Sequence, residues 1–444
     1  MRIQTLKFAW MPAVLASALA LTACGTGATE PKEVKENNGA AVPSAPKPIN
    51  LFFYTDVTDE VFQATWGERI QKQFPHVTIK HQQGVKGFRI EDLVAAGTIP
   101  DVMRTQTTTI RNEYLDLGLS YDMRELVQKH KLDLNRFNPV YLQRIINETG
   151  ASGGEVYGLP INSPSPLVLF YNKDLFDKFG VPYPKDGMMW DNLVPLVQQL
   201  SRSEGGILYR GLTTNYMSVL RDNSLSTPII NPIADEIADT TKWQLMFNNL
   251  KRFYEIPNNP MAATLNAELQ MFYKERTAAM YVGQINQFNS FPADLSWDMV
   301  SVPQLKEAPG KLSQLTPPYW SITRQSKLKD EAFAVILDLL SEEVQLKQSK
   351  EGKIPTLSDK KLEQAFGADT PALKGKNTKA VFYQPFADPT PLRKSDLPFV
   401  PLGTQQSIIS TAFEKVAKQG IDVNTALRDA QEQVKKELDK VKAK

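Results

Sequence analysis

The sequence predicts an α/β protein with parallel sheets, and three observations support this fold class. Short apolar runs alternate with amphipathic helical stretches from residue 49 onward. A strand–helix–strand–helix–strand order at this spacing requires right-handed crossovers, which place parallel strands side by side. The chain also has 444 residues, 42% of them hydrophobic, so it can bury the cores of two or three domains.

The clearest alternation lies between residues 49 and 106. "INLFFYTD", "HVTIKH" and "PDVMRTQ" predict three strands. In the first intervening helix, Thr58 or Asp59 is suited to cap the N-terminus, and "RIEDLVAAG" predicts a second helix that stops at Gly97. Four apolar residues recur on one face of the first helix: Phe62, Trp66, Ile70 and Phe74. This stripe places Trp66 in the core rather than in a ligand site.

The middle and end of the chain continue the pattern. "PLVLFY" predicts a strand, and Asn172 is suited to cap a helix that ends at Gly180. "AAMYVG", "WDMVSVP" and "YWSITRQS" predict further strands. "VNTALRDAQEQVKKELDKV" predicts a C-terminal amphipathic helix whose charges form a solvated face.

The N-terminus predicts export. Arg2 and Lys7 precede an apolar run over 8–21, which is shorter than the roughly 20 residues of a membrane-spanning helix. The chain's single cysteine, Cys24, follows in "LTACG". This stretch resembles the bacterial lipobox, in which cleavage leaves a lipidated cysteine as the new N-terminus. We therefore expect a lipoprotein signal peptide over 1–23.

Residues 24–48 contain no aromatic residue and are rich in Pro, Ala, Gly and charges, which predicts a flexible tether. The whole chain has 51 Lys+Arg and 49 Asp+Glu. The predicted signal peptide removes two basic residues and no acid, so the remaining chain is neutral. A neutral chain lacks the basic surface that nucleic-acid binding requires, and only a lipid would attach it to a membrane.

Six segments in order resemble the extracellular solute-binding proteins of ABC importers, in the sugar-binding group that includes maltose-binding protein. They are "AAGTIPDV" at 95–102, "YGLP" at 157–160, "LFYNKDLFDKFGV" at 169–181, "FYKERTAAMYVG" at 272–283, "DEAFAVILDLL" with "EGKIPT" at 330–356, and "VNTALRDAQEQV" near the end. The resemblance runs over nearly the whole chain after the predicted signal peptide. One departure is Met189, which stands just before "WDNL", where a threonine usually caps the helix that follows.

The resemblance implies a two-lobed periplasmic-binding-protein-like fold, each lobe a mainly parallel sheet flanked by helices, with a ligand cleft between the lobes. The implied N-terminal lobe comprises 49–162 plus 313–345. The implied C-terminal lobe comprises 163–312 plus 346–444. Ligand contact with both lobes favours the closed state, so binding becomes hinge closure.

The same resemblance implies a function without catalysis, cofactor or metal. A monomeric, lipid-anchored protein on the extracellular face of the cell membrane, in a Gram-positive-like envelope, would capture a carbohydrate, in particular an oligosaccharide. It would deliver this ligand to the transmembrane subunits of an ABC transporter. Positions of acidic or aromatic sugar contacts in maltose-binding protein carry other residues here, which argues against maltodextrin.

Sugar sites combine aromatic faces with planar polar groups, so we searched for such residues just after strands. This search gives Tyr54, Asp56, Arg104, Thr105, Tyr319 and Trp320, and Ser163 and Ser165 fall where the chain should cross between the lobes. The resemblance adds candidates at ligand positions of the family: Asn215, Tyr216, Gln284 and Asn286. Several have competing roles. Asp56 can start a helix, Ser163 and Ser165 can serve turns around prolines, and one of Tyr319 and Trp320 is expected in the core.

Catalytic alternatives receive less support from the sequence. Ser152 lies in a Gly-x-Ser-x-Gly match, "GASGG", but the strand–turn–helix context of a nucleophile elbow is missing. The histidines, His76, His81 and His130, lack metal-ligand spacing, and the first two are expected to be exposed. A surface glycoside-active enzyme, which needs two carboxylates across the cleft, and a non-transporting sugar sensor or adhesin remain the alternatives.

Overall fold

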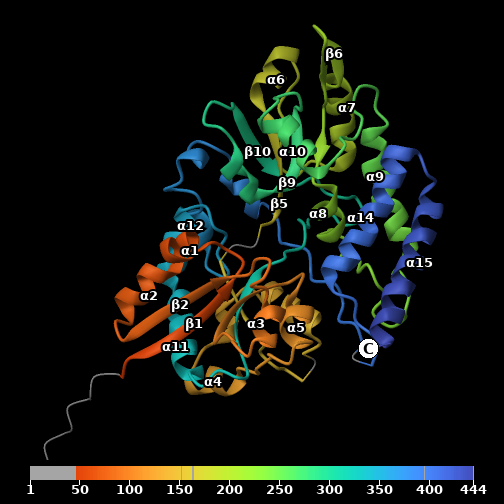
Figure 1. Cartoon of the computed structure of the whole chain (residues 1–444). Helices are drawn as coiled ribbons and strands as arrows, with labels where there is room; N and C mark the ends of the chain where they lie inside the picture. Colours follow the sequence, from red (N-terminus) through yellow and green to blue (C-terminus); the bar gives the residue numbers. More distant parts are fainter. Residues whose placement is uncertain (1–46, 152, 163–164, 395, 444) are drawn as a thin grey trace, which may run out of the picture. The chain divides into compact units, whose positions relative to one another are not determined.

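The computed structural model describes residues 47–151, 153–162, 165–394 and 396–443, and two sheets organise this part of the chain (Figure 1). The first sheet has the order β2-β1-β3-β11-β4. Its strands are β1 (Ile49–Thr55), β2 (Val77–Gln83), β3 (Val102–Gln106), β4 (Leu159–Pro160) and β11 (Pro318–Ile322). β1 pairs in parallel with β2 and β3, while β11 runs antiparallel to β3 and β4.

The second sheet has the order β10-β5-β9-β8. Its strands are β5 (Leu167–Asn172), β8 (Thr213–Thr214), β9 (Met280–Gln284) and β10 (Trp297–Ser301). β5 runs antiparallel to both neighbours, and β8 pairs in parallel with β9. A separate hairpin joins β6 (Arg202–Glu204) to β7 (Ile207–Tyr209). The predicted α/β class is confirmed, but the sheets are mixed: in each main sheet one strand runs opposite to the others, so four of the seven strand pairings are antiparallel.

Helices cover both faces of the first sheet. Along β1, Leu51 and Phe53 join one apolar cluster, whereas Phe52 and Tyr54 join another on the opposite face, as strand alternation requires. The surrounding helices are α1 (Asp59–Phe62), the π-helical turn η1 (Gln63–Gly67), α2 (Glu68–Gln73), α3 (Ile90–Ala95), η2 (Arg111–Leu115), α4 (Arg124–Lys129), η3 (Leu134–Arg136), α5 (Pro139–Thr149), α11 (Lys329–Leu339), α12 (Glu342–Lys350) and α13 (Lys360–Gln364).

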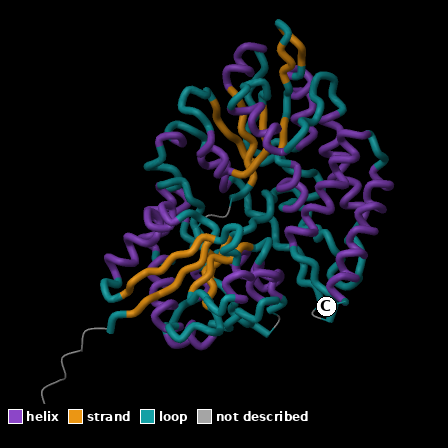
Figure 2. The backbone as a smooth tube through the Cα atoms, viewed as in Figure 1, coloured by secondary structure: helices purple, strands orange, loops and turns teal. Residues whose placement is uncertain are grey.

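The second sheet is covered in the same way, as the purple helices around its orange strands show (Figure 2). Leu167 and Leu169 of β5 join one cluster, and Val168 and Phe170 join the other. Its helices are α6 (Lys173–Phe179), α7 (Trp190–Leu200), α8 (Tyr216–Arg221), α9 (Thr240–Tyr254), α10 (Leu265–Tyr273), η4 (Ile285–Ser290), η5 (Pro371–Leu373), η6 (Thr378–Phe382), α14 (Leu402–Gln419) and α15 (Val423–Lys442). α14 and α15 lie side by side in Figure 1; α14 contacts α8 and α9, and α15 contacts α9.

The predicted helix ends are confirmed. The hydroxyl of Thr58 accepts a hydrogen bond from the backbone of Val61 at 3.4 Å, and the Asn172 carbonyl oxygen caps α6. Gly97 and Gly180 follow α3 and α6 with positive φ. At α7, the backbone N–H of Met189 donates to Asn192 Oδ1 at 2.8 Å, so Asn192 holds the helix start in place of the missing threonine.

Two connections join a strand of one sheet to a strand of the other, and a third crossing follows α13, because Leu362 packs with the first sheet and Phe366 and Leu373 with the second. The chain leaves β4 at Pro160 and enters β5 at Leu167, and it returns from β10 to β11 over 302–317. A later stretch departs from the expected lobe division. Leu357 and Leu362, assigned by the sequence to the second lobe, pack in the core of the first sheet, because residue 357 bridges to Phe137.

The predicted signal peptide, the tether and Cys24 lie outside the described residues. Within the described part of the chain, no helix is both long and apolar enough to span a membrane.

Candidate ligand site

A polar cavity of about 260 Å³ is lined by residues from both sheets and from the segments that connect them. Its lining residues are Arg104, Gln106, Thr107, Thr108, Ser165, Arg221, Gln284, Asn286, Thr316 and Pro318. Strand ends explain why these residues gather. Gln106 ends β3 opposite Pro318, and Gln284 ends β9 opposite the start of β5. The carboxyl ends of β3 and β9 therefore both open into this cavity, where α/β sheets bind ligands.

One exposed carboxylate organises the first-sheet wall. Asp56, directly after β1, accepts hydrogen bonds from the guanidinium of Arg104 and from Gln106 Nε2, the latter at 2.8 Å. The Asp56 side chain is 51% exposed, whereas that of Arg104 is only 11% exposed. Arg104 Nε is buried and has no hydrogen-bond partner within the described part of the chain. The wall thus contains an oriented cation with an unused donor.

The second-sheet wall holds a second arginine that other side chains already hold in place. Arg221, at the end of α8, donates through Nε to Asp222 Oδ1 at 2.8 Å and through Nη1 to Gln406 Oε1 at 2.8 Å. Its Nη2 contacts Asp222 and the hydroxyl of Thr316. Although burial lowers the pKa of Arg221, the buried Asp222 carboxylate raises it, and the net direction is upward. Arg221 therefore remains charged and stays fixed against its aspartate.

The chemistry of the wall is that of a binding site. Hydroxyl, amide and guanidinium groups surround the cavity, and its ten lining residues include no carboxylate, thiol or imidazole. Among the described residues, no group of three or more His, Cys, Asp or Glu side chains is arranged to hold a metal ion. The cavity can donate and accept many directional hydrogen bonds to a polar solute.

The structure brings together part of the predicted site. Four of the candidates line the cavity: Arg104, Ser165, Gln284 and Asn286. Asp56 lies outside the lining and holds two of its side chains. Ser163 and Ser152 lie outside the described residues.

Four candidates near the first sheet are buried instead. Tyr319 and Trp320 face opposite sides of β11, but both are fully buried because helices cover both faces. The prediction that one of them faces a ligand therefore differs from the structure. The hydroxyl of Thr105 lies 3.0 Å from that of Ser321 inside the sheet. Tyr54 packs in the other apolar cluster, where burial, followed by the charge of Glu113, raises its pKa to about 12.

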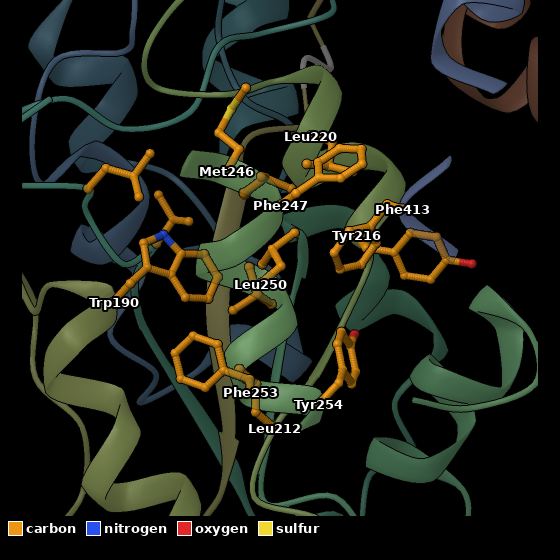
Figure 3. Close-up of a cluster of buried hydrophobic side chains, with 14 of the residues drawn as sticks. Trp190, Leu212, Tyr216, Leu220, Met246, Phe247, Leu250, Phe253, Tyr254 and Phe413 are labelled. Atoms are coloured by element: carbon orange, nitrogen blue, oxygen red, sulfur yellow. The ribbon is translucent and has the colours of Figure 1, made fainter. Parts of the chain in front are cut away.

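The aromatic candidate of the second sheet is also in the core. Tyr216 is 1% exposed, and its ring centroid lies 5.7 Å from that of Phe413. Figure 3 shows both side chains in the same apolar cluster. Its hydroxyl donates to Glu414 Oε1 at 2.5 Å. Asn215 caps α8 by accepting from the backbone of Ser218. Both residues therefore have structural roles, Asn215 as the cap of α8 and Tyr216 in core packing.

The sequence prediction missed six of the ten residues that line the cavity. Gln106 ends a predicted strand, and Thr107 and Thr108 directly follow it, so the rule that selected Arg104 would have found them. Arg221 and Thr316 carry no such signal, because one ends a helix and the other lies in a connecting segment. Their place in the site depends on the tertiary fold.

The prediction that His81 is exposed is wrong, because its side chain is only 2% exposed. It lies within β2, its Nε2 is 2.8 Å from Thr55 Oγ1, and its Nδ1 is 3.0 Å from Asp59. The imidazole also stacks on Phe62 at 4.2 Å. His81 thus supports both ends of the loop that carries Asp56.

Residues 55–346 match the family of bacterial extracellular solute-binding proteins, and the chain belongs to this family. The match contains every strand of both sheets except β1, of which it covers only Thr55, and it includes every residue that lines the cavity. The cavity is therefore a candidate solute site in a protein of a solute-binding class.

Solved structures share this fold. An ABC substrate-binding protein from Listeria monocytogenes in complex with cycloalternan has 20% identity and a TM-score of 0.68, covering 88% of this chain and 99% of that one. The sugar-binding protein MalE from Xanthomonas citri has 18% identity and a TM-score of 0.66, with coverages of 88% and 98%. UgpB from Mycobacterium tuberculosis, in complex with glycerophosphocholine, has 16% identity and a TM-score of 0.67, with coverages of 89% and 99%. These similarities confirm the predicted two-lobed binding-protein fold.

Proposed function

We propose that this protein captures a carbohydrate in the cavity between its two sheets and delivers it to an ABC importer. The proposal is supported by the fact that both sheets contribute residues to the lining of one cavity. Residues from β3, β9, α8 and both connecting segments surround one polar cavity. A solute that contacts both walls stabilises the arrangement in which they are close, so binding drives hinge closure.

The choice of a carbohydrate is supported by the wall chemistry and by the structural neighbours. Gln106, Gln284 and Asn286 provide amides that both donate and accept, and the threonine and serine hydroxyls do the same. Such groups match the paired donor and acceptor character of sugar hydroxyls. The Listeria neighbour holds cycloalternan and the Xanthomonas neighbour is a sugar-binding protein, which is consistent with this choice.

The glycoside-active alternative is less well supported. Glycoside hydrolysis uses two carboxyl groups that flank the bond, about 5–10 Å apart. The lining of the cavity contains no carboxylate, and the nearest aspartates, Asp56 and Asp222, are engaged by Arg104 and Arg221. A binding function therefore accounts for these residues better than hydrolysis.

The mode of attachment is part of the same proposal. Lipidation of Cys24 would hold a monomeric protein on the extracellular face of the membrane through the tether 24–48, beside the transporter's transmembrane subunits. Two acyl chains suffice for stable anchoring. In a Gram-positive-like envelope without an outer membrane, this anchor would prevent a secreted binder from diffusing away.

A thermal-melt screen of the purified protein against mono- and oligosaccharides tests the function. A ligand that binds only the native state at about 100 times its Kd adds roughly 2.7 kcal/mol of stability. We expect a clear rise in melting temperature with one class of sugar, and recovery of that sugar intact. Recovery of cleaved sugar would favour the enzyme instead. The absence of any shift across a broad panel would refute carbohydrate binding.

A further inference from the structure

The cavity wall has an excess of hydrogen-bond donors. Two arginines contribute donors only, and the ten lining residues include neither a carboxylate nor an aromatic ring. Each hydroxyl of a neutral sugar donates as well as accepts, so its site needs acceptors beside donors and gains from an aromatic platform. This wall is better suited to a ligand that mainly accepts hydrogen bonds.

Arg104 is the group with unused capacity. Its Nη1 donates to Asp56, but Nε is buried without a partner in the described part of the chain. Buried polar donors are almost always paired in native proteins, and an unpaired one is costly, particularly on a charged group. A guanidinium can bind a planar or tetrahedral oxyanion through two parallel N–H groups. Arg104 lines the cavity, so an oxyanion there can accept from guanidinium N–H groups that Asp56 does not use.

A further cation lies near Arg104. Burial lowers the pKa of the Lys353 ammonium, and the neighbouring charges of Lys347 and Arg104 lower it further, against the opposing influence of Glu351. Lys353 thus adds a second basic group near Arg104. Across the cavity, Arg221 is held by Asp222, Gln406 and Thr316, whereas Asp56 is the one carboxylate among the described residues that pairs with Arg104.

We propose that the solute carries an oxyanion group, a carboxylate or a phosphate ester, and that this group binds Arg104. The inference rests on the proposed function, because it defines the charge of the carbohydrate that occupies the same cavity. Asp56 then acts as the resting counter-ion that keeps the Arg104 guanidinium oriented before the ligand arrives. The amides and hydroxyls of the wall would bind the sugar hydroxyls.

The test is calorimetric titration of the purified protein with matched compounds. Glucose is compared with glucuronate and with glucose 6-phosphate, and galactose oligomers are compared with galacturonate oligomers. We expect the charged member of at least one pair to bind at least tenfold more tightly than its neutral counterpart, with affinity falling as salt rises. Comparison of the carboxylate and phosphate compounds identifies which oxyanion the site accepts.

Variants connect the preference to Arg104. We expect Arg104→Gln to remove the preference for the charged sugar without a change in melting temperature, and Arg104→Lys to retain part of it. Arg428→Gln removes the same charge from an exposed position of α15 and serves as the control. An unchanged preference in Arg104→Gln would overturn the assignment of the anchor.

The outcomes also separate this inference from the proposed function. Tighter binding of the neutral sugars would overturn the oxyanion proposal and leave carbohydrate binding intact. Binding of inorganic phosphate or glycerol phosphate without binding of any sugar would refute the carbohydrate and retain the anion site. Binding of none of these compounds would overturn both.

Discussion

The guanidinium of Arg104 donates a hydrogen bond to the carboxylate of Asp56, which joins the end of β3 to the loop after β1. Gln106 donates to the other oxygen of the same carboxylate at 2.8 Å. One exposed aspartate therefore fixes two side chains of the cavity wall. This arrangement positions the donors before a solute binds, so less conformational freedom is lost on binding.

Neutralising Asp56 tests its role as a counter-ion. In Asp56→Asn, the amide oxygen can still accept from Arg104 or Gln106, but the competing negative charge is gone. Exposed ion pairs contribute about 0.2–1 kcal/mol, so we expect an oxyanion-bearing sugar to bind up to about fivefold more tightly. Calorimetric titration measures the change. Asp294→Asn, in an exposed pair with Arg276, is the control, and weaker binding by Asp56→Asn would contradict the counter-ion role.

Tyr216 distinguishes the core from the site. Its hydroxyl donates to Glu414 and, together with Lys418, lowers the pKa of that carboxyl against the opposing effect of burial. We expect Tyr216→Phe to lower the free energy of unfolding by about 1 kcal/mol, the usual net contribution of such a bond. Ligand affinity should not change. Urea unfolding measures the stability and calorimetric titration the affinity. Weaker ligand binding at unchanged stability would show instead that Tyr216 contacts the ligand.

Trp320 is expected to contribute to stability alone. The side chain is fully buried, and its ring lies 5.1 Å from Trp66 and 5.9 Å from Phe53. Trp320→Ala should lower the free energy of unfolding by about 3–5 kcal/mol through the cavity it leaves. Phe88→Ala, at a side chain that is 51% exposed, should change it by less than about 0.5 kcal/mol. Equal effects of the two substitutions in chemical denaturation would refute this account of β11.

His81 predicts a pH dependence. Burial lowers the pKa of its imidazole, although Asp59 opposes the shift. The folded state therefore favours the neutral ring, and the stability that this provides is present above the unfolded pKa of about 6.5 and is lost as the pH falls below it. We expect the difference in unfolding free energy between wild type and His81→Gln to shrink from pH 7.5 to pH 5.5. Urea unfolding at each pH measures this difference. A difference that grows toward pH 5.5 would contradict a lowered pKa of His81 in the folded state.

Local patterns were sufficient to predict the elements of the fold. The stripe from Phe62 to Ile70 identified a buried helix face, and Thr58, Asn172 and Gly180 marked helix ends, because caps and periodicity depend on near neighbours. The strand-end rule likewise placed Arg104 and Gln284 at the cavity. These features follow from residues close in sequence.

The remaining site residues could not be predicted from local patterns. Tyr319 and Trp320 both follow the strand alternation, but a sheet covered on both faces buries both, and coverage is a tertiary property. Arg221 reaches the cavity only because α8 follows β8 beside β9. The position of Asp56 beside Arg104 likewise depends on the pairing of β1 with β3.

The central claim is that one solute binds to the walls of both sheets. The dissociation constant of that solute, measured for two single variants, tests it most directly. Gln106 belongs to the wall of the first sheet and Gln284 to that of the second. If one solute contacts both walls, Gln106→Ala and Gln284→Ala should each weaken binding about tenfold, or about 1.4 kcal/mol, at an unchanged melting temperature. Gln325→Ala, at an exposed position, should have no effect. Wild-type affinity in either cavity variant would contradict a site shared by the two sheets.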